Sequence, residues 1–362
     1  MSSEKNIWTK LKKKKSAMGG LVFIIFTGLL ALFAYFLVGD SSPNANNQKA
    51  EIALKSPNFA TQVIILKNNR YEDGRSILDR FMNGAEKPYD YYPIINAKVV
   101  AEGVEVTTHY NKKKIIKASA LYNELQANDL IPHLKLQKYW LGTDRYGRSI
   151  SSRLILGIRI SLLVGLLAVI ISLFVGTVIG GVGGYFGGWI DRVVMYLINV
   201  MWSIPTLLLV FAIVLAFGRG LGVIFLAVGL TMWVDVARIV RGQVKKIKEE
   251  QFVQAAKSMG VREYNILFRH ILPNIIGPIL VIAAANFATA ILIEAGLSYL
   301  GFGVRPPTPS IGNMLNEHYG YAITGKPILA LVPAVTIMLM VLSFNLLGSG
   351  LRDVFDVKDG GN

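Results

Sequence analysis

The sequence contains no cysteine, which excludes disulfides, cysteine-based metal sites and thiol catalysis. Histidine is scarce, and the four residues show no metal-ligand spacing: His109, His133, His270 and His318. A phosphate-binding loop of the form Gly-x-x-x-x-Gly-Lys-Ser/Thr is also missing, because Gly325-Lys326 runs directly into Pro327. No nucleophile and base stand in a recognisable pattern. We therefore expect no enzymatic site, no cofactor and no metal in this chain.

Apolar residues, in contrast, are abundant. Hydrophobic residues make up 52% of the 362 residues, and the mean hydropathy is +0.45, which soluble domains rarely reach. The formal net charge is +15. Its basic residues flank long apolar runs, which indicates contact with anionic lipid headgroups and signals of membrane topology. No nucleic-acid motif occurs, so we expect membrane lipid and not nucleic acid as a partner.

The N-terminus combines a basic start with a long apolar run. Residues 1–16 include Lys10 and the run Lys12 to Lys15, and residues 17–38 are almost entirely apolar. A signal peptide also starts with basic residues, but its apolar core is about 7–15 residues long and ends at a small-residue cleavage site. The longer run favours an uncleaved first transmembrane helix, and its preceding lysines indicate a cytoplasmic N-terminus.

A polar segment follows at residues 39–139. Strand-like stretches occur at Gln62–Lys67 and Ala97–Thr108, and a helix is possible near Lys117–Ala127. If residues 17–38 cross the membrane outward, this segment lies outside the cytoplasm. We predict a small extracytoplasmic α+β insert between the first two membrane helices, followed by an outer-face segment at residues 140–159.

Residues 160–349 contain five further apolar runs long enough to span a bilayer. They are Ile160–Tyr185, Val193–Phe217, Leu221–Ile239, Ile276–Leu300 and Pro327–Leu347. The total of six spans places the connection at residues 239–275 and the tail at residues 350–362 on the cytoplasmic side. Basic residues dominate the stretch from Arg238 to Asn274, with eight lysines and arginines against three glutamates. This excess agrees with the orientation that the N-terminal lysines indicate.

The second of the six predicted spans, Ile160–Tyr185, carries glycines at four-residue intervals. Gly176, Gly180, Gly184 and Gly188 fall on one helix face, where the missing side chains allow another backbone to approach closely, with Gly188 at the turn that follows the span. We interpret this row as a helix-packing surface.

The cytoplasmic connection contains a short amphipathic helix. Phe252, Ala255, Ala256 and Met259 recur at helical spacing and form one apolar face. Gly260 follows where a helix stop is expected, because glycine adopts the left-handed conformation at little cost. A second helical stretch at Arg262 to His270 should end near Pro273. Periodicity alone leaves two alternatives open: the apolar face docks on a partner, or it folds back on the chain's own helices.

These residues resemble the EAA loop of ABC importer permeases. The matching pattern is Ala255-Ala256, then Gly260 after three residues, then Leu272-Pro273, and the glutamate of the motif is replaced by Gln254. In that family the loop forms the coupling helix that docks on the ATPase subunit. The resemblance implies that the ATPase-coupling residues here are Phe252, Gln254, Ala255, Ala256, Met259, Gly260, Leu272 and Pro273.

A second match precedes residue 160. The segment Leu141 to Ser149 resembles the Gly-Thr-Asp-x-x-Gly-Arg-Asp motif of the dipeptide and oligopeptide branch of these permeases, with Ser149 in place of the second aspartate. Its residues are Gly142, Thr143, Asp144, Gly147 and Arg148, and Arg153 follows. We expect them to form a structural network on the outer face. Contact with a substrate-delivery protein is the alternative.

The resemblance covers residues 139–357 and implies an all-α membrane protein with the six-helix architecture of type I ABC importer permeases. It further implies a subunit of the bacterial inner membrane that forms a path for peptides together with a second permease. Two separate ATPase subunits would bind ATP and Mg²⁺, and an extracytoplasmic binding protein would deliver the substrate. Dipeptides, oligopeptides, glutathione-like peptides and nickel chelates are all carried by similar permeases.

Two other functions remain compatible with the residues alone. A secondary transporter would need intramembrane charges and repeated halves, and few such charges occur. A membrane-anchored sensor would use residues 40–139 as its working part. Glu294 is a carboxylate inside the fifth predicted span, and a structural role is favoured over a role in transport because the outer end is near.

Overall fold

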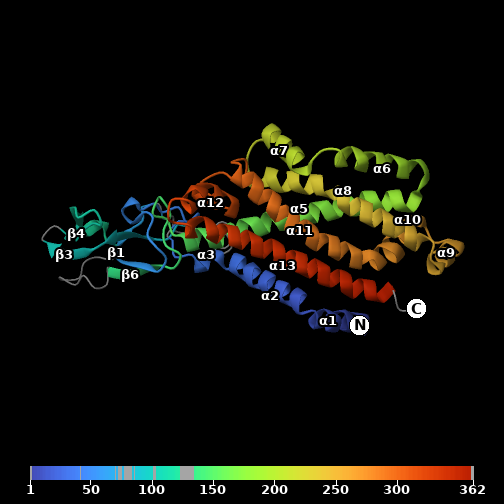
Figure 1. The fold of residues 1–362 in the computed structure, drawn as a ribbon, viewed down its shortest axis with the longest axis horizontal. Helices are drawn as coiled ribbons and strands as arrows, with labels where there is room; N and C mark the ends of the chain where they lie inside the picture. Colours follow the sequence, from blue (N-terminus) through green and yellow to red (C-terminus); the bar gives the residue numbers. More distant parts are fainter. Residues whose placement is uncertain are drawn as a thin grey trace.

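The computed structural model describes residues 2–40, 42–69, 71, 76, 84, 86–100, 103–122 and 134–359, with backbone only for residues 2–7 and 356–359. The molecule is elongated (Figure 1). Strands gather at one end, long helices run along the molecule, and helix α9 lies at the opposite end with both termini. The two motif regions of the sequence therefore lie at opposite ends of the long helices.

The helices account for most of the described chain. Their bounds are α1 Ser2–Lys13, α2 Lys15–Leu32, α3 Ala34–Leu37, α5 Ile150–Phe186, α6 Gly188–Trp202, α7 Thr206–Phe217, α8 Leu221–Lys248, α9 Gln251–Ser258, α10 Glu263–Asn265, α11 Ile276–Tyr299, α12 Ile311–His318 and α13 Ile328–Asp359. A π-helical turn at Ile266–Ile271 and a 3-10 turn at Leu272–Ile275 join α10 to α11. Within the described residues, five helical segments are long and apolar enough to cross a membrane, or six if α6 and α7 together count as one.

Most of the predicted spans lie where the apolar runs placed them. Helix α2 covers most of residues 17–38, and α5, α8, α11 and α13 cover four of the five later runs. The structure extends several of them beyond the apolar run. Helix α5 begins ten residues earlier, at Ile150, where Ser149 accepts a hydrogen bond from the backbone N–H of Ser152 as an N-cap. Helix α13 continues through residues 350–359 of the predicted tail.

The predicted span at Val193–Phe217 consists of two helices in the structure. Helices α6 and α7 meet at an angle of 85°, with the break at Ser203, Ile204 and Pro205. Pro205 has no backbone N–H and its ring clashes with the preceding turn, which favours a break or kink at this position. Hydropathy alone does not register this break, because the residues on both sides are apolar.

Close packing of α5 against α8 forms the centre of the helical part. A Cβ atom at Gly176 would lie 2.6 Å from the carbonyl oxygen of Trp233, and one at Gly184 would lie 2.7 Å from that of Arg241. Real Cβ atoms do not approach backbone so closely, so these two positions require glycine. Gly176, Gly180 and Gly184 are confirmed as a helix-packing surface, whereas Gly188 lies in α6 with no atom within 4 Å of an added Cβ.

The strands described between residues 59 and 139 form two small antiparallel sheets. One sheet has the order β2-β1-β6 and the other β3-β4-β5, built from β1 Phe59–Lys67, β2 Tyr89–Ile94, β3 Asn96–Val100, β4 Gly103–Thr107, β5 Lys113–Lys117 and β6 Leu134–Tyr139. The predicted stretch Gln62–Lys67 lies within β1, and Ala97–Thr108 is a hairpin of two strands with Val99 opposite Val104. Ile64 of the first sheet and Val106 of the second belong to one buried cluster, so the sheets share a small core.

The helix predicted near Lys117–Ala127 falls partly outside the described residues. Its described part contains only a 3-10 turn at Ala118–Ala120, directly after β5. The connection predicted at residues 239–275 also has different bounds in the structure, because α8 continues to Lys248 and leaves a shorter linker before α9. Pro273 does not end the second helical stretch. It lies in the first turn of the 3-10 segment, where a missing N–H costs little, and the chain continues into α11.

Candidate functional site

Helix α9 turns one face toward the protein. Val253 and Ala256 are buried, with 2% and 4% of their surface exposed, and both belong to a cluster with Val244 of α8. The same cluster contains Ile266 and Ile271 of the π-helical turn that leads to α11. The apolar face expected from periodicity is therefore divided. Ala256, predicted to meet a partner, instead packs against the chain's own helices.

The other face of α9 projects away from the protein. Ala255 is exposed, Phe252 has 46% of its surface exposed, and Met259 has 75%. These three residues recur at i, i+3 and i+7, so they lie on one side of the helix. We call them the outward face. Covering an exposed apolar side chain with a partner or a membrane is favourable, by about 25 cal/mol per Å² of apolar area removed from water.

Hydrogen bonds fix α9 at both ends. The side-chain amide of Gln254 donates to the backbone carbonyl of Lys248, the last residue of α8, at 3.0 Å. At the other end, the N–H groups of Gly260 and Val261 donate to the carbonyls of Lys257 and Ala256, at 3.0 and 3.2 Å. This pair of bonds is a Schellman motif, which needs a left-handed residue, and Gly260 has φ +72°. The helix stop predicted at Gly260 is confirmed.

The remaining residues of the predicted coupling region lie farther along the chain. Leu272 is half-buried against the same cluster as Val253, whereas Pro273 is exposed. Both lie in the 3-10 turn before α11, and Leu272 packs against the cluster that anchors α9.

At the opposite end of the molecule, the predicted outer-face motif forms a tight turn. Gly142 and Gly147 have positive φ angles of +80° and +75°. The Thr143 hydroxyl donates to the carbonyl of Ile52 at 2.5 Å and accepts from the N–H of Lys55 at 2.9 Å. The turn therefore holds the chain that leads from α3 to β1 against the start of α5.

Asp144 closes this turn. Its Oδ1 accepts the N–H groups of Tyr146 and Arg148 at 2.8 and 2.9 Å, and its Oδ2 accepts Nε of Arg148 at 2.6 Å. Asp144 has no exposed surface, and Arg148 has 5%. Such a charge-assisted pair inside the protein is strongly oriented.

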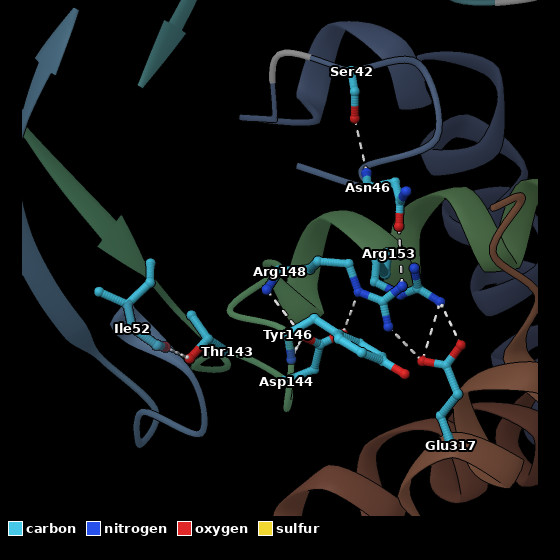
Figure 2. A network of polar contacts seen from close by, with 9 residues as sticks. All are labelled: Ser42, Asn46, Ile52, Thr143, Asp144, Tyr146, Arg148, Arg153 and Glu317. Carbon is cyan, nitrogen blue, oxygen red and sulfur yellow. Dashed lines mark hydrogen bonds and ion pairs between the residues drawn. The ribbon is translucent and has the colours of Figure 1, made fainter. Parts of the chain in front are cut away.

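Arg148 and Arg153 converge on one carboxylate from a distant part of the chain (Figure 2). Nη2 of Arg148 lies 2.5 Å from Oε2 of Glu317, and Nη2 of Arg153 lies 3.3 Å from Oε1. Arg148 also donates to the side-chain oxygen of Asn46 at 3.1 Å. Helix α12, which carries Glu317, is thereby connected to the start of α5. The predicted network is present, and its acidic centre is a residue that the sequence motif did not contain.

His318 lies beside this network with none of its surface exposed. Burial is the main cause that lowers the pKa of His318, and the nearby Arg148 and Arg153 lower it further, against the opposite effect of Asp144 and Glu317. Asp144, Glu317 and His318 place one ligand atom each within 4.8 Å of one another, as in a metal site. However, both carboxylates already receive arginine N–H groups, and a divalent cation there would face two guanidinium charges. The donor set fits an ion-pair network and not a metal centre.

A cavity of about 590 Å³ opens beside the network. Five arginines line it, namely Arg145, Arg148, Arg153, Arg219 and Arg305, and we call it the arginine pocket. Arg219 precedes α8 and Arg305 lies between α11 and α12, so their neighbours in sequence give no sign that they meet Arg148 in space. Only the three-dimensional structure identifies this pocket.

Glu294 in α11 has no exposed surface and is satisfied by neighbouring hydroxyls. Ser161 of α5 donates to it at 2.7 Å and Ser298 at 2.8 Å. The bond from Ser161 connects α5 to α11, which favours the structural interpretation of this carboxylate.

Comparisons with known proteins assign the fold to a family. Residues 172–358, just over half of the chain, match the family described as binding-protein-dependent transport system inner membrane component. Residues 5–57 match the N-terminal TM domain of oligopeptide transport permease C. The last part of α5 and helices α6 to α13 lie almost entirely within the first match, and α1 to α3 lie largely within the second.

Relatives include the glutathione transport system permease protein GsiD of Pectobacterium atrosepticum, 40% identical over 61% of this chain and 73% of its own length. The protein of that name from Salmonella typhimurium is 44% identical over the same shares. Among solved structures, the MetNI methionine ABC transporter in an inward facing conformation matches with 20% identity and a TM-score of 0.47, over 57% of this chain and 97% of that one. From its sequence matches, this multi-pass inner-membrane chain belongs to the family of binding-protein-dependent transport permeases, the membrane subunits of ABC importers.

Proposed function

We propose that this permease subunit imports small peptides, and that its outward face docks on a separate ATPase subunit. The observation that carries the proposal is the division of α9 into two faces. Val253 and Ala256 anchor the helix internally, while Phe252 and Met259 leave a firmly held apolar surface uncovered. A helix that needed only to fold back on its own chain would have no reason to present both large side chains outward.

The proposed orientation has both termini and α9 in the cytoplasm. Lysines precede α2, and the last turn of α8 carries Lys245, Lys246 and Lys248. Cytoplasmic ends of membrane helices are enriched in such residues. Both basic regions lie at the same end of the molecule in Figure 1. In this orientation α6 and α7 form one broken span among six, and the two sheets lie outside as the insert.

Peptide transport is supported by the relatives. Two of them carry glutathione in their names, and the N-terminal match is to an oligopeptide transport permease. The proposed assembly contains a second permease subunit, two ATPase subunits and an extracytoplasmic binding protein. ATP and Mg²⁺ bind to the ATPase subunits, and this chain contributes the path and the coupling surface.

The packing around α9 suggests how motion passes into the membrane. The buried face of α9 shares one cluster with the end of α8 and with the turn before α11. A displacement of α9 by the ATPase therefore acts on two long helices at once, because close-packed side chains resist compression. Helix α8 packs along α5 through the glycine row, so the start of α5 at the other end moves with it.

Reconstitution of the complete complex tests the function. The proteoliposomes contain both permeases, the ATPase subunits and the binding protein. They should accumulate tripeptides only when ATP is present on the side of the membrane where the ATPase subunits lie. A complex with a hydrolysis-deficient ATPase is the matched control and should accumulate none. Peptide accumulation by this chain without ATPase subunits, driven by an ion gradient, would contradict the proposal.

A further inference from the structure

The arginine pocket has more positive charge than its acidic neighbours balance. The negative charges of Asp144 and Glu317 neutralise the positive charges of Arg148 and Arg153. Both arginines are 95% or more buried. Among the residues that the structure describes, Arg145, Arg219 and Arg305 have no acidic partner. Three guanidinium groups from three separate segments therefore face one cavity without compensation.

Aromatic rings hold two of the lining arginines in place. The guanidinium of Arg145 lies 4.6 Å from the ring centre of Tyr146, and that of Arg219 lies 4.8 Å from the ring centre of Phe302. A stacked guanidinium keeps its in-plane N–H groups available for a ligand. Such groups are matched in geometry to carboxylates, which they bind through two parallel hydrogen bonds.

Buried Arg153 adds a second indication of an anion. Within the described part of the chain, its Nε and Nη1 have no hydrogen-bond partner, although Nη2 contacts Glu317. Its guanidinium lines the pocket beside the three arginines that form no ion pair with a described residue. The cavity volume of about 590 Å³ lies within the range of about 300–1,000 Å³ found for small-ligand sites.

We propose that the arginine pocket binds carboxylate groups of the peptide substrate before it passes between the membrane helices. This proposal rests on the proposed function, because it takes the ligand to be a transported peptide. The pocket then selects peptides with an additional acidic group over neutral ones. Arg145, Arg219 and Arg305 contact the substrate carboxylates, and the pairs of Arg148 and Arg153 with Glu317 hold the floor rigid.

Two tripeptides that differ by one carboxylate provide the test, Ala-Glu-Ala and Ala-Gln-Ala. Uptake is measured in proteoliposomes with the complete complex, once with the native chain and once with Arg145→Gln, Arg219→Gln and Arg305→Gln combined. The expected result is a KM for Ala-Glu-Ala that rises about tenfold or more, while that for Ala-Gln-Ala changes less than threefold. A variant with Arg305→Lys alone should show a smaller rise, since it keeps the charge and loses the planar fork.

The matched control removes three lysines from the surface of the sheets, Lys98→Gln, Lys112→Gln and Lys117→Gln. These side chains are exposed and do not line the pocket. The control should leave the ratio of the two KM values unchanged, and a change equal to that of the arginine variant would overturn the proposal.

Two further outcomes would each refute the proposal. An equal loss for both tripeptides, with weaker stimulation of ATP hydrolysis by the binding protein, would overturn the proposal and identify the pocket as a docking site for an acidic protein surface. Failure of the native complex to take up either tripeptide would instead refute peptide transport itself, and the pocket's proposed ligand with it.

Discussion

The side-chain amide of Gln254 donates to the carbonyl of Lys248, 3.0 Å away, and so joins α9 to the end of α8. The family motif has glutamate at this position, and a carboxylate cannot donate this bond. In this chain the glutamine therefore secures the angle between the two helices. Its exposed position leaves it next to the outward face, where that angle determines how a partner meets Phe252 and Met259.

Replacement Gln254→Glu should loosen this junction. The new carboxylate would face the Lys248 carbonyl without a proton to share, with a loss of about 1 kcal/mol or less, as is typical of one exposed hydrogen bond. We expect peptide uptake per ATP hydrolysed to fall severalfold in the reconstituted complex, with normal membrane insertion. Gln251→Glu on the same helix is the matched charge control. Equal coupling in the two variants would show that the bond to Lys248 is unimportant.

Replacement Gly260→Ala tests the helix stop. The residue has φ +72°, and an added Cβ atom would meet no other atom within 4 Å, so the cost is conformational only. We expect a loss of about 1–2 kcal/mol in local stability, measured as faster amide hydrogen exchange in α9. Gly242→Ala is the control, because that glycine lies inside α8 with equally open surroundings. It should stabilise its helix by roughly 0.5–1 kcal/mol. Similar exchange in both variants would contradict the Schellman interpretation.

Replacement Glu317→Gln should be strongly destabilising. It leaves Arg148 and Arg153 buried around a neutral amide, and removal of one partner from a buried ion pair costs about 3–5 kcal/mol. The melting temperature of the purified protein should fall by several degrees. Asp353→Asn provides the comparison, because its pair with Lys14 is about half exposed and should contribute only about 0–1 kcal/mol. Equal decreases in melting temperature in the two variants would show that the ion pairs of Glu317 stabilise the protein no more than an exposed pair does.

The buried His318 predicts a dependence of stability on pH. Its folded pKa lies below the ordinary value of 6.5, so the unfolded chain binds a proton that the folded chain excludes. Stability from this residue is thus fully present above about pH 6.5 and declines as the pH falls, by at most roughly 1.4 kcal/mol per pH unit. Melting temperatures between pH 5 and 8 should show this decline in the native chain and a weaker decline in His318→Gln. Parallel curves would exclude a contribution from His318.

Much of the membrane part follows from local sequence, because a span needs only a continuous apolar run. Helices α2, α5, α8, α11 and α13 satisfy that condition and were predictable. The break between α6 and α7 was missed, because hydropathy averages over a whole segment and gives no weight to Pro205, the residue that marks the break. The helix at residues 251–258 was predicted from its period, but not the inward position of Ala256. Which side of a short helix is covered depends on Val244 and Ile266, which approach it only in the folded chain.

The network around Glu317 and the arginine pocket were harder to predict from the sequence than the membrane helices. Asp144, Arg148 and Arg153 lie within ten residues of one another, and their network was predictable from the motif. Glu317 lies 169 residues from Arg148, and no spacing rule relates the two. Arg219 and Arg305 likewise reach the pocket from separate linkers, so charge counts from the sequence could not locate them.

The docking of the outward face on an ATPase can be tested by cross-linking in native membranes. The chain has no cysteine, so Met259→Cys and Lys257→Cys each provide a single attachment point for a photoactivatable reagent. Met259 lies on the outward face, whereas Lys257 is exposed on the opposite side of α9. We predict that the reagent at residue 259 captures an ATPase subunit in high yield and that the reagent at residue 257 captures little. Capture of only lipid or this chain itself at residue 259 would contradict the account.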